Sequence, residues 1–173
     1  MDFEKLISER YSVRNFRSEY LPKTVIDEIL HAAHMAPTGC NYQPQRILVM
    51  NTDDSIAKLK TCTKCHFNAP TAMLVCHNRE ESWVRKYDGA HSSPVDAVIV
   101  TTYLMLAAQN EGVGTCWVMH FNPAAMREAF NIPDHIEPIA LLVMGYPSED
   151  AKPLDMHFKS RPIDETVIYE EFK

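Results

Sequence analysis

Three short segments of this chain are apolar without interruption, and they limit the possible folds more than any other feature. They are residues 47–50 (ILVM), 73–76 (MLVC) and 139–144 (IALLVM). A strand with one face in water alternates apolar and polar residues, whereas a strand covered on both faces is apolar throughout. The pattern therefore predicts a central β-sheet sandwiched between helices.

Periodicity and turn residues predict the elements around these segments. Helices are expected over residues 2–10, 22–36, 53–62, 93–111 and 123–130. Strands are expected over residues 46–51, 71–77, 115–121, 137–145 and 165–169. Apolar residues cover most of the circumference of the helix 93–111, so this helix should be covered on two sides. The second cover is either a partner subunit or the chain's own C-terminal tail.

Length and charge exclude several classes of protein. A chain of 173 residues suits one compact domain, and a net charge of −6 argues against a general nucleic-acid binder. The most apolar long segment, residues 95–108, is too short to span a bilayer comfortably. The N-terminus lacks the apolar run of a signal peptide, and five cysteines do not suggest a disulfide framework. A cytoplasmic protein is expected.

The segment 10–16 (RYSVRNF) carries two arginines and a serine at alternate positions. In an extended backbone Arg10, Ser12 and Arg14 point the same way, because side chains alternate between the two faces. Guanidinium groups hold the oxygens of a phosphate dianion in pairs, and a hydroxyl adds another donor. The spacing is compatible with one shared ligand, and the alternative is a solvated helix end with surface arginines, as expected for Arg17.

Two further segments combine glycine with polar or backbone donors. In residues 36–44 (APTGCNYQP), Gly39 allows a tight turn, while Thr38 and Asn41 can cap or bind locally. This segment is either a simple helix-terminating loop or a binding loop. Residues 112–117 (GVGTCW) follow a helix and lack a third glycine, so they are not a dinucleotide fingerprint. Backbone N–H groups in the strand that follows, over residues 118–120, are candidates to donate to a cofactor ring.

In their order and spacing, these three segments resemble the FMN-dependent nitroreductase family, and so does the tail motif at residues 159–162 (KSRP). The resemblance covers nearly the whole chain. It implies an α+β fold of the nitroreductase type, with a mixed β-sheet flanked by helices on both faces. It also implies an intertwined homodimer with two FMN sites at its interface. Residues 1–173 would form one domain whose tail, about residues 150–173, wraps the partner subunit.

The resemblance also implies roles for individual residues. The arginine–serine–arginine set would hold the FMN phosphate and the pyrimidine edge of the ring, the loop after the second helix would reach the partner's flavin, and the tail cations would clamp the phosphate. Many relatives carry glycine in place of His120, which is a candidate pocket residue and proton donor; no other residue is assigned to the chemistry. The expected FMN-binding residues are Arg10, Tyr11, Ser12, Arg14, Pro37, Thr38, Gly39, Asn41, Trp117, Val118, Met119, His120, Lys159 and Arg161.

The function that the resemblance implies is the reduction of nitroaromatic, quinone or similar conjugated acceptors by NADH or NADPH. The reaction would run in two steps, as a ping-pong hydride transfer through FMN. The expected partners are a second copy of the chain and a small-molecule electron acceptor, with no nucleic acid, membrane or metal. The chain is shorter than many relatives, so a more open pocket over the flavin is expected.

One motif points to a different class of protein. Cys62, Cys65 and His66 match C-x-x-C-H, which in an exported protein attaches a c-type haem. A zinc site would need more ligands, and Cys76 and His77 are neighbours in a strand, so they point to opposite faces. A redox C-x-x-C would open a helix, whereas this one follows a helix. The alternative hypothesis is a non-enzymatic metal-binding or redox-sensing module.

Overall fold

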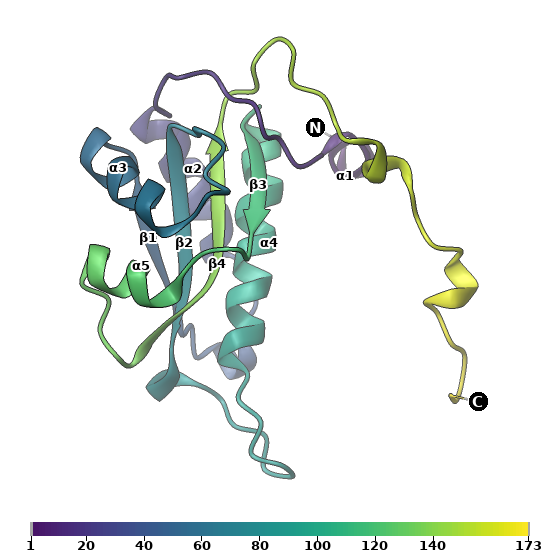
Figure 1. Cartoon of the computed structure of the whole chain (residues 1–173). Helices are drawn as coiled ribbons and strands as arrows, with labels where there is room; N and C mark the ends of the chain where they lie inside the picture. The colour runs from purple at the N-terminus through teal and green to yellow at the C-terminus, as the bar shows by residue number, and fades with distance from the viewer. Residues whose placement is uncertain (1, 173) are drawn as a thin grey trace.

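The computed structural model describes residues 2–172, which form five α-helices and four strands (Figure 1). In chain order they are α1 (Phe3–Glu9), α2 (Lys23–His34), β1 (Gln45–Met50), α3 (Asp53–Cys62), β2 (Thr71–Asn78), α4 (Ser93–Asn110), β3 (Gly114–Val118), α5 (Pro123–Phe130) and β4 (Ile136–Gly145). The helix and strand bounds expected from the sequence differ from these by a few residues at most, apart from the expected strand 165–169.

The four strands form one sheet in the order β1-β2-β4-β3. Each neighbouring pair is antiparallel, with a register shift between Val75 and Cys76 where β2 meets β4. The expectation of a mixed sheet is corrected to this extent: parallel pairing within residues 2–172 is confined to the isolated bridge between Ser12 and Thr115. The strand β3 lies at one edge of the sheet, and this edge is where the segment after α1 crosses it.

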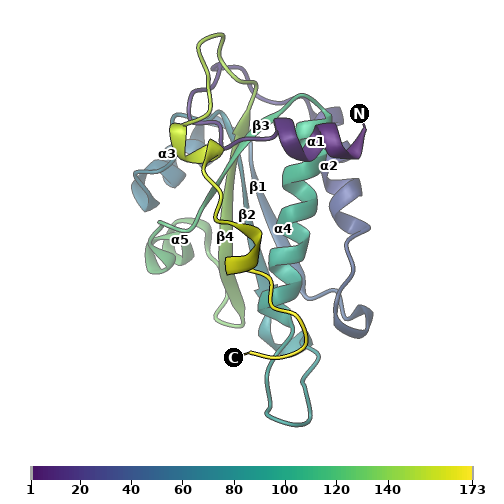
Figure 2. The same ribbon diagram turned by 90° about the vertical axis from the view of Figure 1, so that its right-hand side faces the viewer.

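Helices cover both faces of the sheet, as the uninterrupted apolar segments predict (Figures 1 and 2). On one face α2 and α4 pack against Met73, Val75, Leu142 and Met144. On the other face α3 and α5 pack against the alternate positions, which include Leu74, Leu141 and Val143. All eight positions of β2 are buried. The α+β class with helices on both faces is thus confirmed.

The prediction of a strand near the C-terminus is wrong. Residues 165–169 form no strand, and Glu165 instead ends a short 3-10 helix, Ile163–Glu165. A strand needs a neighbour with which to pair, and this tail runs as an arm that stands away from the sheet (Figures 1 and 2). The arm carries large exposed apolar residues, among them Ile163, Tyr169 and Phe172, which are 77%, 83% and 88% exposed.

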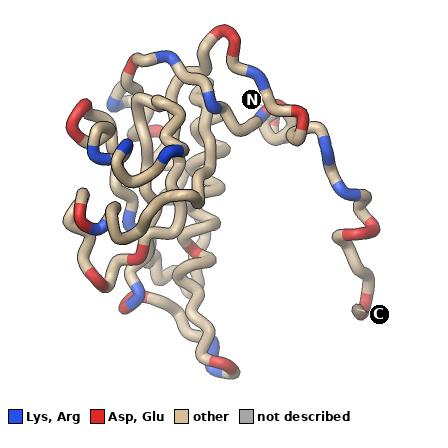
Figure 3. The backbone as a smooth tube through the Cα atoms, in the orientation of Figure 1, with Lys and Arg blue, Asp and Glu red and all other residues tan. Residues whose placement is uncertain are grey.

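The outer face of α4 is not covered by the chain's own tail. Val95 and Val98 on this helix are 60% and 41% exposed, and Tyr103 is 38% exposed. Burial under the tail, one of the two alternatives for the second side of this helix, is therefore absent over the described residues. Lysines and arginines are interspersed with acidic residues in the peripheral helices, the loops and the tail, whereas α4 and the central strands carry few charges (Figure 3). Among residues 2–172, every helix is too short or too polar to cross a membrane.

Candidate functional site

Residues 10–17, called the strap below, cross the edge of the sheet directly after α1 ends (Figure 1). Ser12 pairs with Thr115 of β3 in a parallel bridge, and the Val13 N–H donates to the Thr115 carbonyl at 2.8 Å. Farther along, the Arg17 N–H donates to the carbonyl of Tyr146, just past β4, at 2.9 Å. The strap is therefore fixed to the ends of two strands.

The alternation expected for an extended segment is present in the strap. The Val13 side chain is 1% exposed and points into the protein, so Ser12 and Arg14 on either side of it point outward. Burial raises the pKa of the Cys116 thiol in β3, while Arg14, a hydrogen bond from Ser12 and Arg10 act in the opposite direction. Ser12 and Arg14 thus face outward beside β3, and Arg10 is close enough to the same thiol to act on it.

The donors on the strap are available to an anion. Within residues 2–172, neither Arg10 nor Arg14 forms an ion pair with a carboxylate, whereas Arg17 lies 3.8 Å from Glu19. The Arg14 guanidinium donates to the Ser12 carbonyl at 3.1 Å and lies 5.8 Å from the centre of the Phe67 ring. Two guanidinium groups and a hydroxyl without an acidic partner suit a phosphate dianion.

A small cavity of about 210 Å³ opens beside the strap. Tyr11, Ser12 and Arg14 line it together with Leu154, Met156 and His157 from the start of the tail. The Tyr11 hydroxyl donates to the Ala151 carbonyl at 3.2 Å, and its ring meets the His157 ring edge-on at 6.3 Å. The strap therefore also positions the first part of the tail.

The loop 37–43 is tight, but for a different reason than expected. Left-handed backbone conformations occur at Cys40, Asn41 and Gln43, with φ of 47°, 59° and 51°, and not at Gly39. Gly39 is required by a close approach, because a Cβ on it would lie 2.7 Å from the Ser92 hydroxyl. The Gly39 N–H donates at 2.9 Å to Asp96, a carboxylate that is 2% exposed.

Other hydrogen bonds within this loop stabilise its shape. The Thr38 hydroxyl accepts from the Gln43 N–H at 3.1 Å, and the Gln43 side chain donates to Asn41 at 3.1 Å. Pro37 and Asn41 are exposed, and Thr38 and Gly39 are half-buried. The polar groups expected to bind a ligand are thus presented by a loop that is anchored on the start of α4.

The strap and the loop 37–43 lie at opposite ends of α4. The loop is bound by Asp96 in the first turn of this helix, whereas the strap is bound by Thr115, which follows its last turn. The helix has 18 residues, which corresponds to about 27 Å. One protomer therefore does not bring its own strap and its own loop together.

The strand β3 is shorter than expected and ends at Val118. Because the Thr115 carbonyl faces the strap, alternation turns the backbone groups of Trp117 toward the same free edge and those of Val118 toward β4. Met119 and His120 lie beyond the strand and are exposed, and the Trp117 indole donates to the Met119 sulfur at 3.2 Å. Trp117 is therefore a better backbone donor at this edge than Val118.

The bend after β3 is held by a residue that sequence reasoning missed. The Thr63 hydroxyl donates to the His120 carbonyl at 2.5 Å, and it accepts from the Cys65 N–H at 3.0 Å. Thr63 is 6% exposed. In the sequence it is one threonine after a helix, and only the burial of a polar residue at that position would have marked it.

The tail cations are not part of the cluster around the strap in this chain. Lys159 and Arg161 lie on the exposed arm, and Arg161 is 4.0 Å from Glu165 of its own turn. Neither residue lines the cavity beside Tyr11 and Arg14. Their expected part in a phosphate clamp stays a prediction.

The cysteine motif does not assemble a metal site in the part of the chain that is described. No group of three or more histidine, cysteine or acidic residues there could hold a metal ion. Cys62 is buried and its thiol donates to the Lys58 carbonyl at 3.3 Å, while His66 accepts from the Asn68 N–H at 3.0 Å. These residues therefore have ordinary structural roles.

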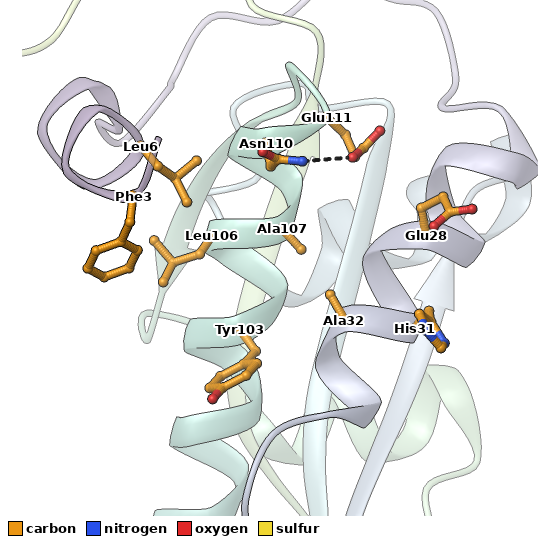
Figure 4. A pocket seen from close by; sticks show the side chains of 10 residues that line it. All are labelled: Phe3, Leu6, Glu28, His31, Ala32, Tyr103, Leu106, Ala107, Asn110 and Glu111. Atoms are coloured by element: carbon orange, nitrogen blue, oxygen red, sulfur yellow. Dashed lines mark hydrogen bonds between the residues drawn. The ribbon is translucent and has the colours of Figure 1, made fainter. Parts of the chain in front are cut away.

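A larger cavity of about 660 Å³ lies away from all of these residues, between α1, α2 and α4 (Figure 4). Phe3 and Leu6 of α1 face Tyr103 and Leu106 of α4 across it, and Ala32 of α2 closes one side. It contains none of the residues expected to bind FMN. Its walls continue the exposed apolar face of α4.

The fold and the strap define an α+β protein with arginine and serine donors at one edge of its sheet, and comparison with known proteins gives the family. The Nitroreductase family model matches residues 7–81 and 61–146, so this chain belongs to the nitroreductase family. A nitroreductase family protein from Clostridium difficile 630 has 39% identity and a TM-score of 0.92, over 99% of this chain and 100% of that one.

Two further relatives agree with this assignment. A Methanothermobacter thermautotrophicus protein named NADH dehydrogenase/NAD(P)H nitroreductase is 27% identical over 163 residues, covering 90% of this chain and 83% of that protein. An Exiguobacterium sibiricum nitroreductase, solved in complex with FMN, has 20% identity and a TM-score of 0.85, over 98% of both chains. The latter likeness shows the shared fold.

Proposed function

We propose that this chain is an FMN-dependent oxidoreductase that reduces nitroaromatic, quinone or similar conjugated acceptors with electrons from NADH or NADPH. The observation that carries the proposal is geometric: Ser12 and Arg14 face outward from the strap at the β3 edge, and over residues 2–172 neither Arg10 nor Arg14 forms an ion pair with a carboxylate. The FMN complex of a structural relative and the nitroreductase names of others support it. A phosphate dianion fits this donor set.

The residues of this chain would bind and orient the cofactor. Arg10, Ser12 and Arg14 would hold the phosphate and the pyrimidine edge of the ring, with Tyr11 fixing the cavity wall beside them. The free edge of β3 at Trp117, and the bend at Met119 and His120, would present backbone N–H groups to the ring. When bound, FMN would supply the hydride and electron transfer between a nicotinamide donor and an acceptor, and the residues named here would hold it in place for that chemistry.

The proposal requires a second copy of the chain. Pro37, Thr38, Gly39 and Asn41 lie at the far end of α4 from the strap, so these residues would contact the flavin of a partner subunit. The exposed apolar residues of α4 and of the tail argue for the same partner, because a monomer would leave them in water. Lys159 and Arg161 would reach a phosphate only where the tail packs against that partner.

The alternative module based on Cys62, Cys65 and His66 has no observation in its favour. Cys62 is 3% exposed and hydrogen-bonded within its helix, which leaves it unsuited to rapid redox exchange. The motif instead covers the last residue of α3 and the loop that leads to β2, and Thr63 in this loop binds the bend after β3.

A visible absorption spectrum of the purified protein tests the proposed function. The protein, if needed after soaking with FMN, should show an oxidised flavin spectrum that bleaches when NADH or NADPH is added without oxygen. Addition of an acceptor should restore the original spectrum. A protein that takes up no flavin would contradict the proposal.

A further inference from the structure

A pocket of about 300 Å³ lies where α3 ends, against the bend that follows β3. Lys60, Lys64 and His120 supply its ionisable side chains, and Thr61 and Asn122 add neutral polar groups. No aspartate or glutamate of the described chain lines it. The pocket is therefore positive or neutral, in a protein whose net charge is −6.

The two lysines are not neutralised by neighbours. Over residues 2–172, neither Lys60 nor Lys64 forms an ion pair, whereas Lys58 on the same helix binds Asp54 at 2.8 Å. The pKa of nearby His66 is lowered first by burial and then by the charges of Lys60 and Lys64. Positive potential is thus concentrated at the end of α3.

The pocket is joined to the proposed flavin site by short hydrogen bonds. Thr63 donates to the His120 carbonyl at 2.5 Å, and the Asn122 N–H donates to the Cys62 carbonyl at 2.9 Å. Both bonds tie the loop after α3 to the bend whose backbone would meet the flavin ring. A reactant placed over the ring would therefore have the lysines to one side of it.

We infer that the pocket formed by Lys60, Lys64 and His120 is a subsite for the anionic group of a reactant, in the first place a carboxylate on the electron acceptor. This inference rests on the proposed function, because the proposed function puts the flavin beside this pocket. Ammonium groups and an imidazole bind carboxylates and phosphates alike, so a phosphate of the dinucleotide donor is a second source of the same chemistry.

Kinetics with matched substrates separate the two sources. The substrates are 4-nitrobenzoate and the uncharged 4-nitrobenzamide, and the variant is Lys60→Gln/Lys64→Gln. Lys58→Gln is the control, because Lys58 lies on the same helix, outside the pocket, and is already paired with Asp54. Anaerobic reduction by NADH and reoxidation by each acceptor are measured as separate half-reactions.

We expect the double variant to reoxidise about fivefold more slowly with subsaturating 4-nitrobenzoate and at an unchanged rate with 4-nitrobenzamide. A loss confined to reduction by NADH would assign the same subsite to a donor phosphate. Equal rates for the variant and the control in all three reactions would overturn the inference.

A binding measurement keeps this test apart from the proposed function. Benzoate and benzamide are titrated into the protein, with and without FMN, and binding is followed by ligand-detected NMR. Weaker benzoate binding in the double variant than in Lys58→Gln would support the subsite even in a protein that takes up no flavin. Equal binding of benzoate and benzamide to the wild-type protein would contradict it.

Discussion

Arg14 is the residue at which three separate parts of the chain meet. It projects from the strap, its guanidinium lies over Phe67 of the loop after α3, and it acts on the Cys116 thiol in β3. Its hydrogen bond to the Ser12 carbonyl uses one of five N–H donors, which leaves the others for a ligand. The side chain is therefore preorganised without being neutralised.

Replacing Arg14 tests this role. We expect Arg14→Ala to raise the Kd for FMN about 10- to 100-fold, which corresponds to the loss of charge-assisted hydrogen bonds to a phosphate. Fluorescence titration of the apoprotein with FMN measures the effect. Arg17→Ala is the control, because Arg17 is on the same strap but paired with Glu19. Equal affinities for the two variants would contradict the assignment.

The sequence predicted these residues where local geometry was sufficient. Alternation along an extended segment was enough to place Ser12 and Arg14 outward on either side of the buried Val13. Local geometry was not enough for Gly39. A glycine is needed there because Ser92, 53 positions further along the chain, packs against it after folding. Thr63 shows the same limit, because its role is a hydrogen bond to the carbonyl of His120, which is distant in the sequence.

At the scale of elements, the strap depends on the close fit between Val13 and β3. Gly114 is the first residue of β3, and a Cβ on it would lie 2.6 Å from Cγ2 of Val13 and 3.0 Å from the Pro147 ring. Any side chain there would push the strap away from the strand. The arrangement of Ser12 and Arg14 therefore depends on a glycine that touches no ligand.

We expect Gly114→Ala to lower the free energy of unfolding by about 1–3 kcal/mol through overpacking, and to weaken FMN binding as the strap moves. Urea unfolding and FMN titration measure the two effects. Adding Val13→Ala should recover part of the FMN affinity. Gly112→Ala is the control: it strains a residue with φ of +72°, but it meets no atom within 4 Å. It should reduce stability and leave FMN binding intact; a similar loss of FMN would count against the strap.

The elements were predictable where burial alone decides them. The apolar segments of β1, β2 and β4 have one structural solution, which is a strand covered on both faces. Strand direction was not predictable, because the same residues suit parallel and antiparallel neighbours. The conformation of the tail was not predictable either. Its Val and Ile residues favour a strand, but the tail lies beside no strand of this chain with which it could pair.

At the scale of the whole molecule, the proposed flavin site requires a second copy of the chain. The strap and the loop 37–43 are separated by the length of α4, and the tail leaves the body (Figure 1) with its apolar residues exposed. The groove between α1 and α4 continues the same exposed surface (Figure 4). In the proposed dimer, a second copy would account for all three features, and each flavin site would be built from the strap of one chain and the loop of the other.

Complementation between two defective chains tests this shared site most directly. One chain carries Arg14→Ala and the other Asn41→Ala; they carry different affinity tags, and the mixed dimer is purified through both. Each homodimer should bind FMN weakly at both sites. The mixed dimer should regain one tight site, because one intact strap then faces one intact loop, and the bound FMN should approach one per dimer. A mixed dimer that binds no better than its parents, or a protein that stays monomeric, would contradict the account.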